Sequence, residues 1–368
     1  MPRTSPLARA VAVACAALLA GALTACSSST EQAVQNTGSA VTSAASPTAG
    51  ATESAETAAG TTSDTTAAGT TALETAGTAA GGERTISTAY GDVTVPATAT
   101  RVAAMSYDTP WQLQSLGVTP IAVQDYGKWI EQFTPEQQAL VAGIPTIGSF
   151  GELNFEAVAA ADPDLIVGDA DEIDEATFKR LSEIAPTAIV KGYSRGDWQA
   201  ITTALAEATG TTAAADTSRT AYESTLNRLR SEYADVIAAN TWVHFSLGDD
   251  ASQFSIQQPT GAIGNLVVNE LGLLYGAGVP TDYSDGGYGS YPLEQLGTIF
   301  AGVTVALYPL NSDGSISPAI KAIQDNELFK RLEVAKSGKV FGLTTSITDF
   351  VTANEWLEEL EATVLSKL

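Results

Sequence analysis

From residue 83 to residue 368, short apolar runs alternate with stretches in which apolar residues recur every three or four positions. The first pattern is typical of buried strands and the second of amphipathic helices. Strands that alternate with helices build mostly parallel sheets covered by helices. The sequence therefore predicts an α/β fold, with strands at residues 102–105, 121–124, 165–168, 188–190, 242–247, 303–308 and 339–343.

One long segment, residues 213–239, contains no proline or glycine and predicts a single helix. Its apolar residues fall three or four apart on one face, namely Tyr222, Leu226, Leu229, Tyr233, Val236 and Ile237. The flanks of this segment look like weak copies of each other, because residues 111–117 and 265–272 both predict helices that end in Leu-Gly. We therefore expect an N-terminal lobe (85–212) and a C-terminal lobe (240–368) joined by this helix.

The N-terminus carries a targeting pattern. Two arginines, Arg3 and Arg9, precede an apolar stretch at 10–23 that is short for a transmembrane helix. The stretch ends in Leu-Thr-Ala-Cys, which resembles the lipobox of bacterial lipoproteins and implies removal of a signal peptide (1–25) and lipidation of Cys26. A plain signal peptide with a chance cysteine is the alternative.

A low-complexity segment follows the cysteine. Residues 27–82 are nearly all Ala, Thr, Ser and Gly, with five acidic residues, no Lys or Arg and no aromatic residue. Such a composition cannot bury enough apolar surface to offset the entropy of an ordered chain. We therefore expect residues 26–84 to form the lipidated end and a disordered tether.

Charge and histidine content exclude several classes of function. The chain has 18 Lys and Arg residues against 42 Asp and Glu residues, a formal net charge of −24, so it cannot form the basic face that nucleic acid requires. A single histidine, His244, cannot build a histidine-rich metal site, and we expect no resident metal or cofactor. The segment from His244 through Ser246 to Gly248 is similar to a hydrolase nucleophile elbow but lacks its first glycine. We expect no enzymatic activity, with a surface-anchored hydrolase as the alternative.

Short motifs follow one another in order along the predicted folded region. They are Val-Pro at 95–96, Arg-Val at 101–102, Leu-Gly-Val-Thr-Pro-Ile at 116–121, Asp-Pro-Asp-Leu-Ile-Val at 162–167, Leu-Ser-Glu-Ile-Ala-Pro-Thr at 181–187 and Ala-Lys-Ser-Gly-Lys-Val at 335–340. In this order they resemble the substrate-binding lipoproteins of the ferric siderophore and cobalamin class, which deliver a ligand to an ABC importer.

The resemblance implies a fold and a set of partners. It implies two lobes, each a small mostly parallel sheet flanked by helices, bridged by one rigid helix, with the ligand in the cleft between them. It also implies a monomer on the extracytoplasmic face of the cell membrane. This monomer would capture a ferric siderophore and deliver it to a permease dimer with its ATPase.

Two glutamates occupy matching positions in the predicted lobes. Glu156 and Glu294 each lie nine residues before a predicted strand, at the start of a predicted helix. The resemblance implies that each glutamate lies at the tip of its lobe and pairs with arginines of the permease. The ordinary alternative is that each carboxylate only stabilises the N-terminal dipole of its helix.

Aromatic and cationic side chains lie in the loops that follow predicted strands. Parallel sheets bind ligands beyond the carboxyl ends of their strands, so these loops predict the cleft wall. The candidates are Tyr107, Trp129, Arg195, Trp198 and Tyr288. Aromatic rings and a guanidinium suit an oxygen-rich chelate, although ordinary packing is the alternative for each residue. Few basic groups favour a hydroxamate over a catecholate siderophore, and haem and cobalamin stay open.

Overall fold

The computed structural model describes residues 82–127, 130–280, 288–344 and 346–368, which all belong to one unit. The predicted signal peptide (1–25), Cys26, nearly all of the predicted tether (26–84) and Trp129 lie outside the described residues. The tether prediction extends two residues too far, because β1 begins at Glu83. No helix in the described ranges is both long and apolar enough to span a bilayer.

The N-terminal lobe holds a hairpin and two small sheets. The antiparallel hairpin pairs β1 (Glu83–Thr88) with β2 (Gly91–Pro96). The first sheet is parallel and has the order β3-β7-β8, from Val102–Ala104, Leu165–Asp169 and Thr187–Val190. The second has the order β4-β5-β6, from Val123–Asp125, Thr146–Ser149 and Glu152–Leu153. Strand β7 is central and wholly buried, as its continuous apolar run predicts.

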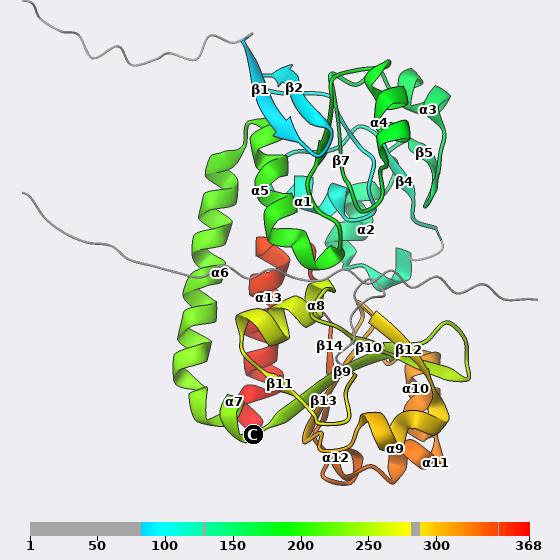
Figure 1. The fold of residues 1–368 in the computed structure, drawn as a ribbon, viewed down its shortest axis with the longest axis vertical. Coiled ribbons are helices and arrows are strands. Elements are labelled where there is room, and N and C mark those ends of the chain that lie inside the picture. Colours follow the sequence, from blue (N-terminus) through cyan, green and yellow to red (C-terminus); the bar gives the residue numbers. More distant parts are fainter. Residues whose placement is uncertain (1–81, 128–129, 281–287, 345) are drawn as a thin grey trace, which may run out of the picture. The chain divides into compact units, whose positions relative to one another are not determined.

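Helices cover these sheets (Figure 1). They are α1 (Thr109–Ser115), α2 (Pro135–Val141), α3 (Phe155–Ala160), α4 (Glu175–Ser182) and α5 (Trp198–Thr209). Side-chain caps fix where several of them begin. The Asn154 carboxamide accepts from Ala157 N at 3.1 Å, and the Asp174 carboxylate accepts from Thr177 N at 2.8 Å. The caps therefore set the starts of α3 and α4.

The C-terminal lobe is built on one mixed sheet with the order β12-β10-β9-β13-β14, and β11 also pairs with β9. Its strands are β9 (Thr241–Leu247), β10 (Gln253–Gln257), β11 (Leu274–Tyr275), β12 (Tyr288–Pro292), β13 (Val305–Pro309) and β14 (Val340–Leu343). Strands β9, β11, β13 and β14 are parallel, whereas β10 pairs antiparallel with both β9 and β12. The helices of this lobe are α8 (Ala262–Gly264), the π-helix Asn265–Glu270, α9 (Leu296–Ile299), α10 (Pro318–Asp325), α11 (Glu327–Lys330) and α12 (Glu333–Lys336).

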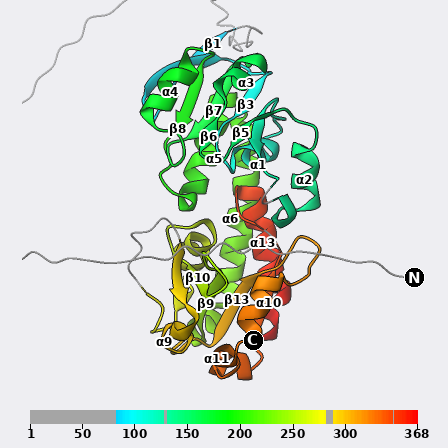
Figure 2. The ribbon, with the colours of Figure 1, turned by 90° about the vertical axis from the view of Figure 1, so that its right-hand side faces the viewer.

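A long helix runs alongside both lobes and packs against a second one, which lies mainly beside the C-terminal lobe (Figures 1 and 2). Helix α6 (Thr212–Glu232) packs along α13 (Phe350–Thr363), as both views show (Figures 1 and 2). The prediction of one continuous helix over 213–239 is wrong at Tyr233, where the backbone leaves helical geometry before α7 (Ala234–Ala239) begins. The α6 residues that are buried, Ala215, Tyr222, Leu226 and Leu229, lie on the predicted face.

The predicted strands are confirmed, each within about two residues of its predicted ends, and the α/β fold with them. The sequence missed the antiparallel strands β1, β2, β10 and β12 and the short strands β5, β6 and β11. The missed antiparallel strands carry mixed polar and apolar residues, such as Gln-Phe-Ser-Ile-Gln in β10. They therefore lack the continuous apolar run that reveals a buried central strand.

Candidate functional site

A cavity of about 200 Å³ is lined by residues of both lobes, near the carboxyl ends of the parallel strands. The N-terminal lobe contributes Tyr107, Phe133 and Arg195. The C-terminal lobe contributes a longer set, which includes Ser246, Leu247, Ile263, Leu310, Asn311 and Thr344. This edge of the sheets is where α/β proteins bind ligands, because the strand ends leave loops free to diverge.

Tyr107 is held in place by its backbone and its ring. Its N–H donates to Glu172 Oε1 at 2.7 Å, and its carbonyl accepts from the Tyr126 hydroxyl at 2.7 Å. Its ring lies 5.4 Å from the ring of Tyr126, 5.6 Å from Phe133 and 6.0 Å from Phe150. Aromatic pairs at these separations attract one another. The cavity wall at Tyr107 is therefore fixed before a ligand enters.

Arg195 lies beside Tyr107 and forms an ion pair with Asp108. Arg195 Nε donates to Asp108 Oδ2 at 2.7 Å and Nη2 donates to Oδ1 at 2.9 Å. The Asp108 side chain is 12% exposed and the Arg195 side chain 48%. The guanidinium carbon also lies 5.7 Å from the centre of the Tyr107 ring. The Asp108 carboxylate raises the pKa of Arg195 further above its ordinary value.

Three more carboxyl groups, those of Asp169, Asp171 and Glu172, lie at or just beyond the end of β7, behind the residues that line the cavity. Burial raises the pKa of Glu172 to about 8, helped by the charge of Asp169, and burial raises that of Asp169 to about 6. Burial also raises the pKa of Asp171, although Arg195 opposes this. Glu172 accepts from Gln124 Nε2 at 3.1 Å in addition to the N–H of Tyr107. At neutral pH Glu172 is therefore mostly protonated, whereas Asp169 is mostly ionised.

Hydrogen bonds tie the two lobes together around the cavity. Gly196 N donates to Thr260 O at 2.8 Å, and Gly196 O accepts from Asn265 Nδ2. An added Cβ at Gly196 would lie 2.4 Å from Thr260 O, so this contact requires glycine. On another side, Gln112 Nε2 donates to Thr348 O at 3.2 Å. These bonds fix the distance between the cavity walls.

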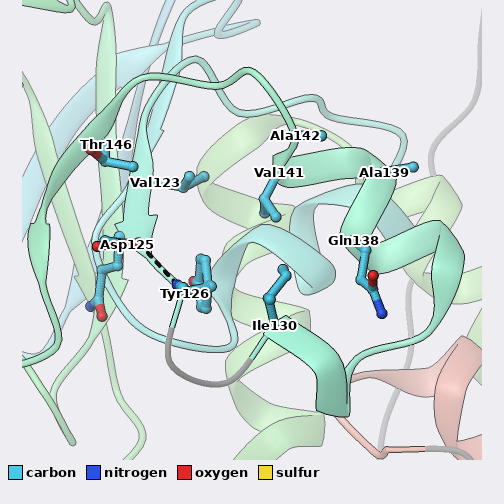
Figure 3. Close-up of a pocket in the computed structure, with 11 residues that line it drawn as sticks. Val123, Asp125, Tyr126, Ile130, Gln138, Ala139, Val141, Ala142 and Thr146 are labelled. Atoms are coloured by element: carbon cyan, nitrogen blue, oxygen red, sulfur yellow. Dashed lines mark hydrogen bonds between the residues drawn. The ribbon is translucent and has the colours of Figure 1, made fainter. Parts of the chain in front are cut away.

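A second hollow of about 480 Å³ lies within the N-terminal lobe between β4 and α2 (Figure 3). Figure 3 shows Val123, Ile130 and Val141 pointing into it, with Tyr126 beside them. Asp125 is the single charged residue among its described lining residues. Although this hollow is larger, it has no cationic donor among those residues, so the cavity between the lobes fits an oxygen-rich ligand better.

The structure shows which of the residues predicted to form the cleft line the cavity. Tyr107 and Arg195 line the cavity. Trp198 does not, because it is 1% exposed and packs 5.5 Å from Tyr222 and 5.3 Å from Phe350 in the core shared with α6 and α13. We therefore correct its assignment from cleft wall to core. Trp129 and the side chain of Tyr288 lie outside the described residues.

Sequence reasoning missed Phe133, Glu172 and the uncharged C-terminal wall. Phe133 lies just before α2, in a region without a strand pattern, and no signal marks it. Glu172 ends the acidic run that follows the predicted strand at 165–168, and that run was a usable signal. Its contacts with Gln124 and Tyr107 join residues 48 and 65 positions apart, which a local pattern cannot show.

His244 lies in β9 and is 2% exposed. Burial lowers its pKa to about 3, so it is neutral and a weak base. Ser246, two residues later on the same strand, lines the cavity. A base with so low a pKa does not suit the hydrolase alternative. In the described part of the chain, no group of three or more His, Cys, Asp or Glu residues is placed to hold a metal ion.

Both predicted docking glutamates are exposed, and neither forms an ion pair with a described residue. Glu156 lies in the first turn of α3, which precedes β7. Glu294 lies in the 3-10 helix Leu293–Gln295, which leads into α9 and then β13. β13 begins at Val305, two residues later than predicted. Both carboxylates thus lie in helical turns that lead towards a strand, although Glu156 precedes its strand by nine residues and Glu294 precedes its strand by eleven.

Comparisons with known proteins agree with this geometry. The chain is 24% identical over 286 residues to the putative ABC transporter substrate-binding lipoprotein YhfQ of Bacillus subtilis, which spans 74% of this chain and 85% of that relative. It is 24% identical over 260 residues to the Fe(3+)-citrate-binding protein YfmC of the same organism, covering 70% and 77%. The siderophore periplasmic binding protein from the fuscachelin gene cluster of Thermobifida fusca superposes with a TM-score of 0.65 at 22% identity, covering 74% of this chain and 99% of that one.

A family model described as periplasmic binding protein matches residues 102–346. These limits run from the start of β3 past the end of β14, and so include the three sheets that follow the hairpin, together with α6. The match takes in every described residue that lines the cavity between the lobes. The chain therefore belongs to the periplasmic binding protein family.

Proposed function

We propose that this protein captures a ferric siderophore outside the cell and delivers it to an ABC permease for iron uptake. The observation that carries the proposal is the cavity between the lobes, where an aromatic ring (Tyr107) and a guanidinium (Arg195) face an uncharged opposite wall. A chelate with an apolar periphery and exposed oxygen atoms suits such walls. Two relatives support this, since one is named as an ABC transporter substrate-binding lipoprotein and the other as a binder of Fe(3+)-citrate.

We propose that the siderophore is a hydroxamate. Catecholate siderophores are strongly anionic and need several cationic partners. Arg195 is the one cationic residue among the described residues that line the cavity, and Asp108 already neutralises it. A ferric tris-hydroxamate carries no net charge on its metal centre, so it loses little when it leaves water for this cavity.

Direct titration tests the proposal. The mature chain without Cys26 is titrated with a ferric hydroxamate, a ferric catecholate, haem and cobalamin, and binding is followed by calorimetry. Saturable binding of a ferric hydroxamate at sub-micromolar concentration is the expected result. Binding of haem or cobalamin alone would replace the iron-chelate assignment with that ligand. Binding of none of the four would remove it.

We propose that Cys26 carries the lipid that keeps the protein on the extracytoplasmic face of the membrane. The apolar stretch that precedes it and the lipoprotein name of one relative support this. The Cys26→Ala variant is expected to lose incorporation of labelled palmitate. Cys15→Ala is the matched control, because Cys15 lies inside the predicted signal peptide, and it is expected to keep the label. Labelling of the Cys26 variant at the wild-type level would exclude lipidation there.

We propose that Glu156 and Glu294 dock the protein on the permease dimer. Both carboxylates are exposed, and each lies in a helical turn that leads towards a strand of its lobe. One anion on each lobe gives two points of electrostatic contact, which fixes the orientation of the complex as well as its rate of formation. The partner surface would then carry two cationic patches related by the symmetry of the permease dimer.

A further inference from the structure

The charge of Arg195 is already balanced inside the protein. Both oxygens of Asp108 accept from its guanidinium, at 2.7 and 2.9 Å, in the two-pronged geometry that gives the strongest carboxylate pairs. The Asp108 carboxylate is 12% exposed and so is largely shielded from solvent. An anionic ligand that approaches Arg195 therefore meets a neutral pair rather than a free cation.

The charges around this pair are acidic. Asp171 is exposed and close enough to interact with Arg195, and Asp169 is 5% exposed at the end of β7. Glu172 is mostly protonated at neutral pH and adds little charge. Two carboxylates, Asp108 and Asp171, therefore act on one guanidinium, which leaves one negative charge in excess beside Arg195.

The opposite wall does not compensate for this excess. Its described lining residues carry hydroxyl, amide and apolar groups but no cation, as Ser246, Asn311 and Thr344 illustrate. Behind that wall, the Glu359 carboxylate accepts from Thr344 N at 2.8 Å and from Thr344 Oγ1 at 2.7 Å. The described lining residues of the opposite wall therefore do not offset the negative charge beside Arg195.

Ferric chelates differ in net charge, so an electrostatic field in the cavity can discriminate between them. Three hydroxamates balance Fe³⁺, so a linear tris-hydroxamate that ends in an ammonium group is a cation. The same chelate with its amine acetylated is neutral, whereas ferric citrate and ferric tris-catecholates are anions. A unit charge about 7 Å from an uncompensated carboxylate, at an effective dielectric constant near 40, changes affinity about tenfold.

We infer that the cavity selects ferric chelates that carry a positive charge, and that Asp108 is the residue that sets this preference. The inference rests on the proposed function and adds to it the charge of the ligand. It predicts a ligand charge opposite to that of the ligand in the name of one relative, the Fe(3+)-citrate-binding protein, because ferric citrate is an anion. Asp108 acts by cancelling Arg195, which would otherwise attract anions.

Three probes test the preference on the wild-type protein. They are ferrioxamine B, which ends in an ammonium group, N-acetyl ferrioxamine B, which does not, and ferric citrate. Calorimetry at low salt is expected to rank them in that order, with about tenfold between the first two, and the difference is expected to shrink at high salt. Equal affinity for the two ferrioxamines, or tighter binding of ferric citrate, would overturn the inference while leaving iron-chelate binding intact.

The Asp108→Asn variant tests the residue. Asp108 precedes α1 but makes no capping hydrogen bond with its side chain, so asparagine is expected to fold there. The variant should lose most of the preference for ferrioxamine B over its acetylated form and bind ferric citrate about tenfold more tightly. Asp92→Asn, which removes one charge from the exposed hairpin strand β2, is the control and should change neither affinity.

Asp171→Asn is a second variant at an exposed position and should shift the preference the same way by a smaller factor. A wild-type preference that survives both variants would remove these carboxylates as its cause. If none of the three chelates binds the wild-type chain, the proposed function itself fails, and this inference fails with it.

Discussion

The two walls of the cavity are made from different chemistry, although both come from lobes with similar architecture. The N-terminal wall holds an aromatic cluster around Tyr107 and an ion pair, Arg195 with Asp108. The C-terminal wall has no charged residue among its described members and offers Leu247, Leu310 and several hydroxyl groups instead. The N-terminal wall can discriminate between ligands by charge, whereas the C-terminal wall supplies contact area and neutral hydrogen bonds.

The lobes are alike in that each presents an exposed glutamate in a helical turn that leads towards a buried parallel strand, and this likeness predicts the largest effect. The Glu156→Ala/Glu294→Ala double variant is expected to reduce iron import in cells to background while chelate affinity stays unchanged, because the docking contacts are lost on both sides. Each single variant should retain part of the uptake. The pair Glu183→Ala/Glu333→Ala removes two other exposed carboxylates and should import normally. Wild-type import by the first double variant would exclude docking at these sites.

Removing contacts from one wall at a time sharpens the comparison inside the cavity. Tyr107→Ala is expected to weaken binding of every chelate by about 2 to 3 kcal/mol, roughly 30- to 150-fold, because a large ring in a fixed cluster is lost. Leu310→Ala in the opposite wall should cost about 1 kcal/mol, since Leu310 is only half-buried. Dissociation constants of both variants for one ferric hydroxamate check this. A larger loss from Leu310→Ala would reverse the assigned importance of the walls.

The lobes should also respond to pH in opposite directions. The pKa of His244 in the C-terminal lobe is lowered to about 3 from 6.5, so its contribution to stability is full above pH 6.5 and is lost as pH falls from 6.5 to 3, by up to about 1.4 kcal/mol per pH unit. The pKa of Glu172 in the N-terminal lobe is raised to about 8 from 4.5, so its contribution is full below pH 4.5 and is lost as pH rises through 8.

Thermal unfolding of two variants at several pH values measures these two opposite pH dependences of stability. His244→Gln is expected to flatten the loss of Tm between pH 6 and pH 4, and Glu172→Gln is expected to raise Tm at pH 9 but not at pH 4. Each variant is the control for the other. The Tm of the His244 variant should follow the wild type at alkaline pH, and the Tm of the Glu172 variant should follow it at acidic pH. Parallel curves for all three proteins would contradict both assignments.

The smallest effect on binding is expected at Trp198, the residue that moved from the predicted cleft to the core. Its indole N–H has no hydrogen-bond partner in the described structure, so Trp198→Phe removes packing alone. Stability should fall by about 1 to 2 kcal/mol, with chelate affinity within about twofold of the wild type. If Trp198→Phe instead bound the chelate tenfold more weakly at an unchanged Tm, Trp198 would have to be assigned to the binding site.

The features that the sequence predicted correctly are those marked by residues close together in the chain. The buried parallel strands are continuous apolar runs, and Arg195 follows one of them closely, so both were found. Trp198 was misassigned because it lies only three residues beyond Arg195, at the first position of α5, and no periodicity in the preceding turn shows which side it faces. The partnership of Asp108 with Arg195 joins residues 87 positions apart and needed the fold.

Gly196 has a consequence for how cargo leaves the protein. Its backbone is bound to Thr260 and Asn265 of the other lobe, and it is the neighbour of Arg195. The walls therefore cannot separate at this point unless these bonds break, whereas the pair of Arg195 with Asp108 lies within one lobe and does not depend on them. Under the proposed function, transfer of a chelate to the permease is therefore expected to begin with the loss of these bonds.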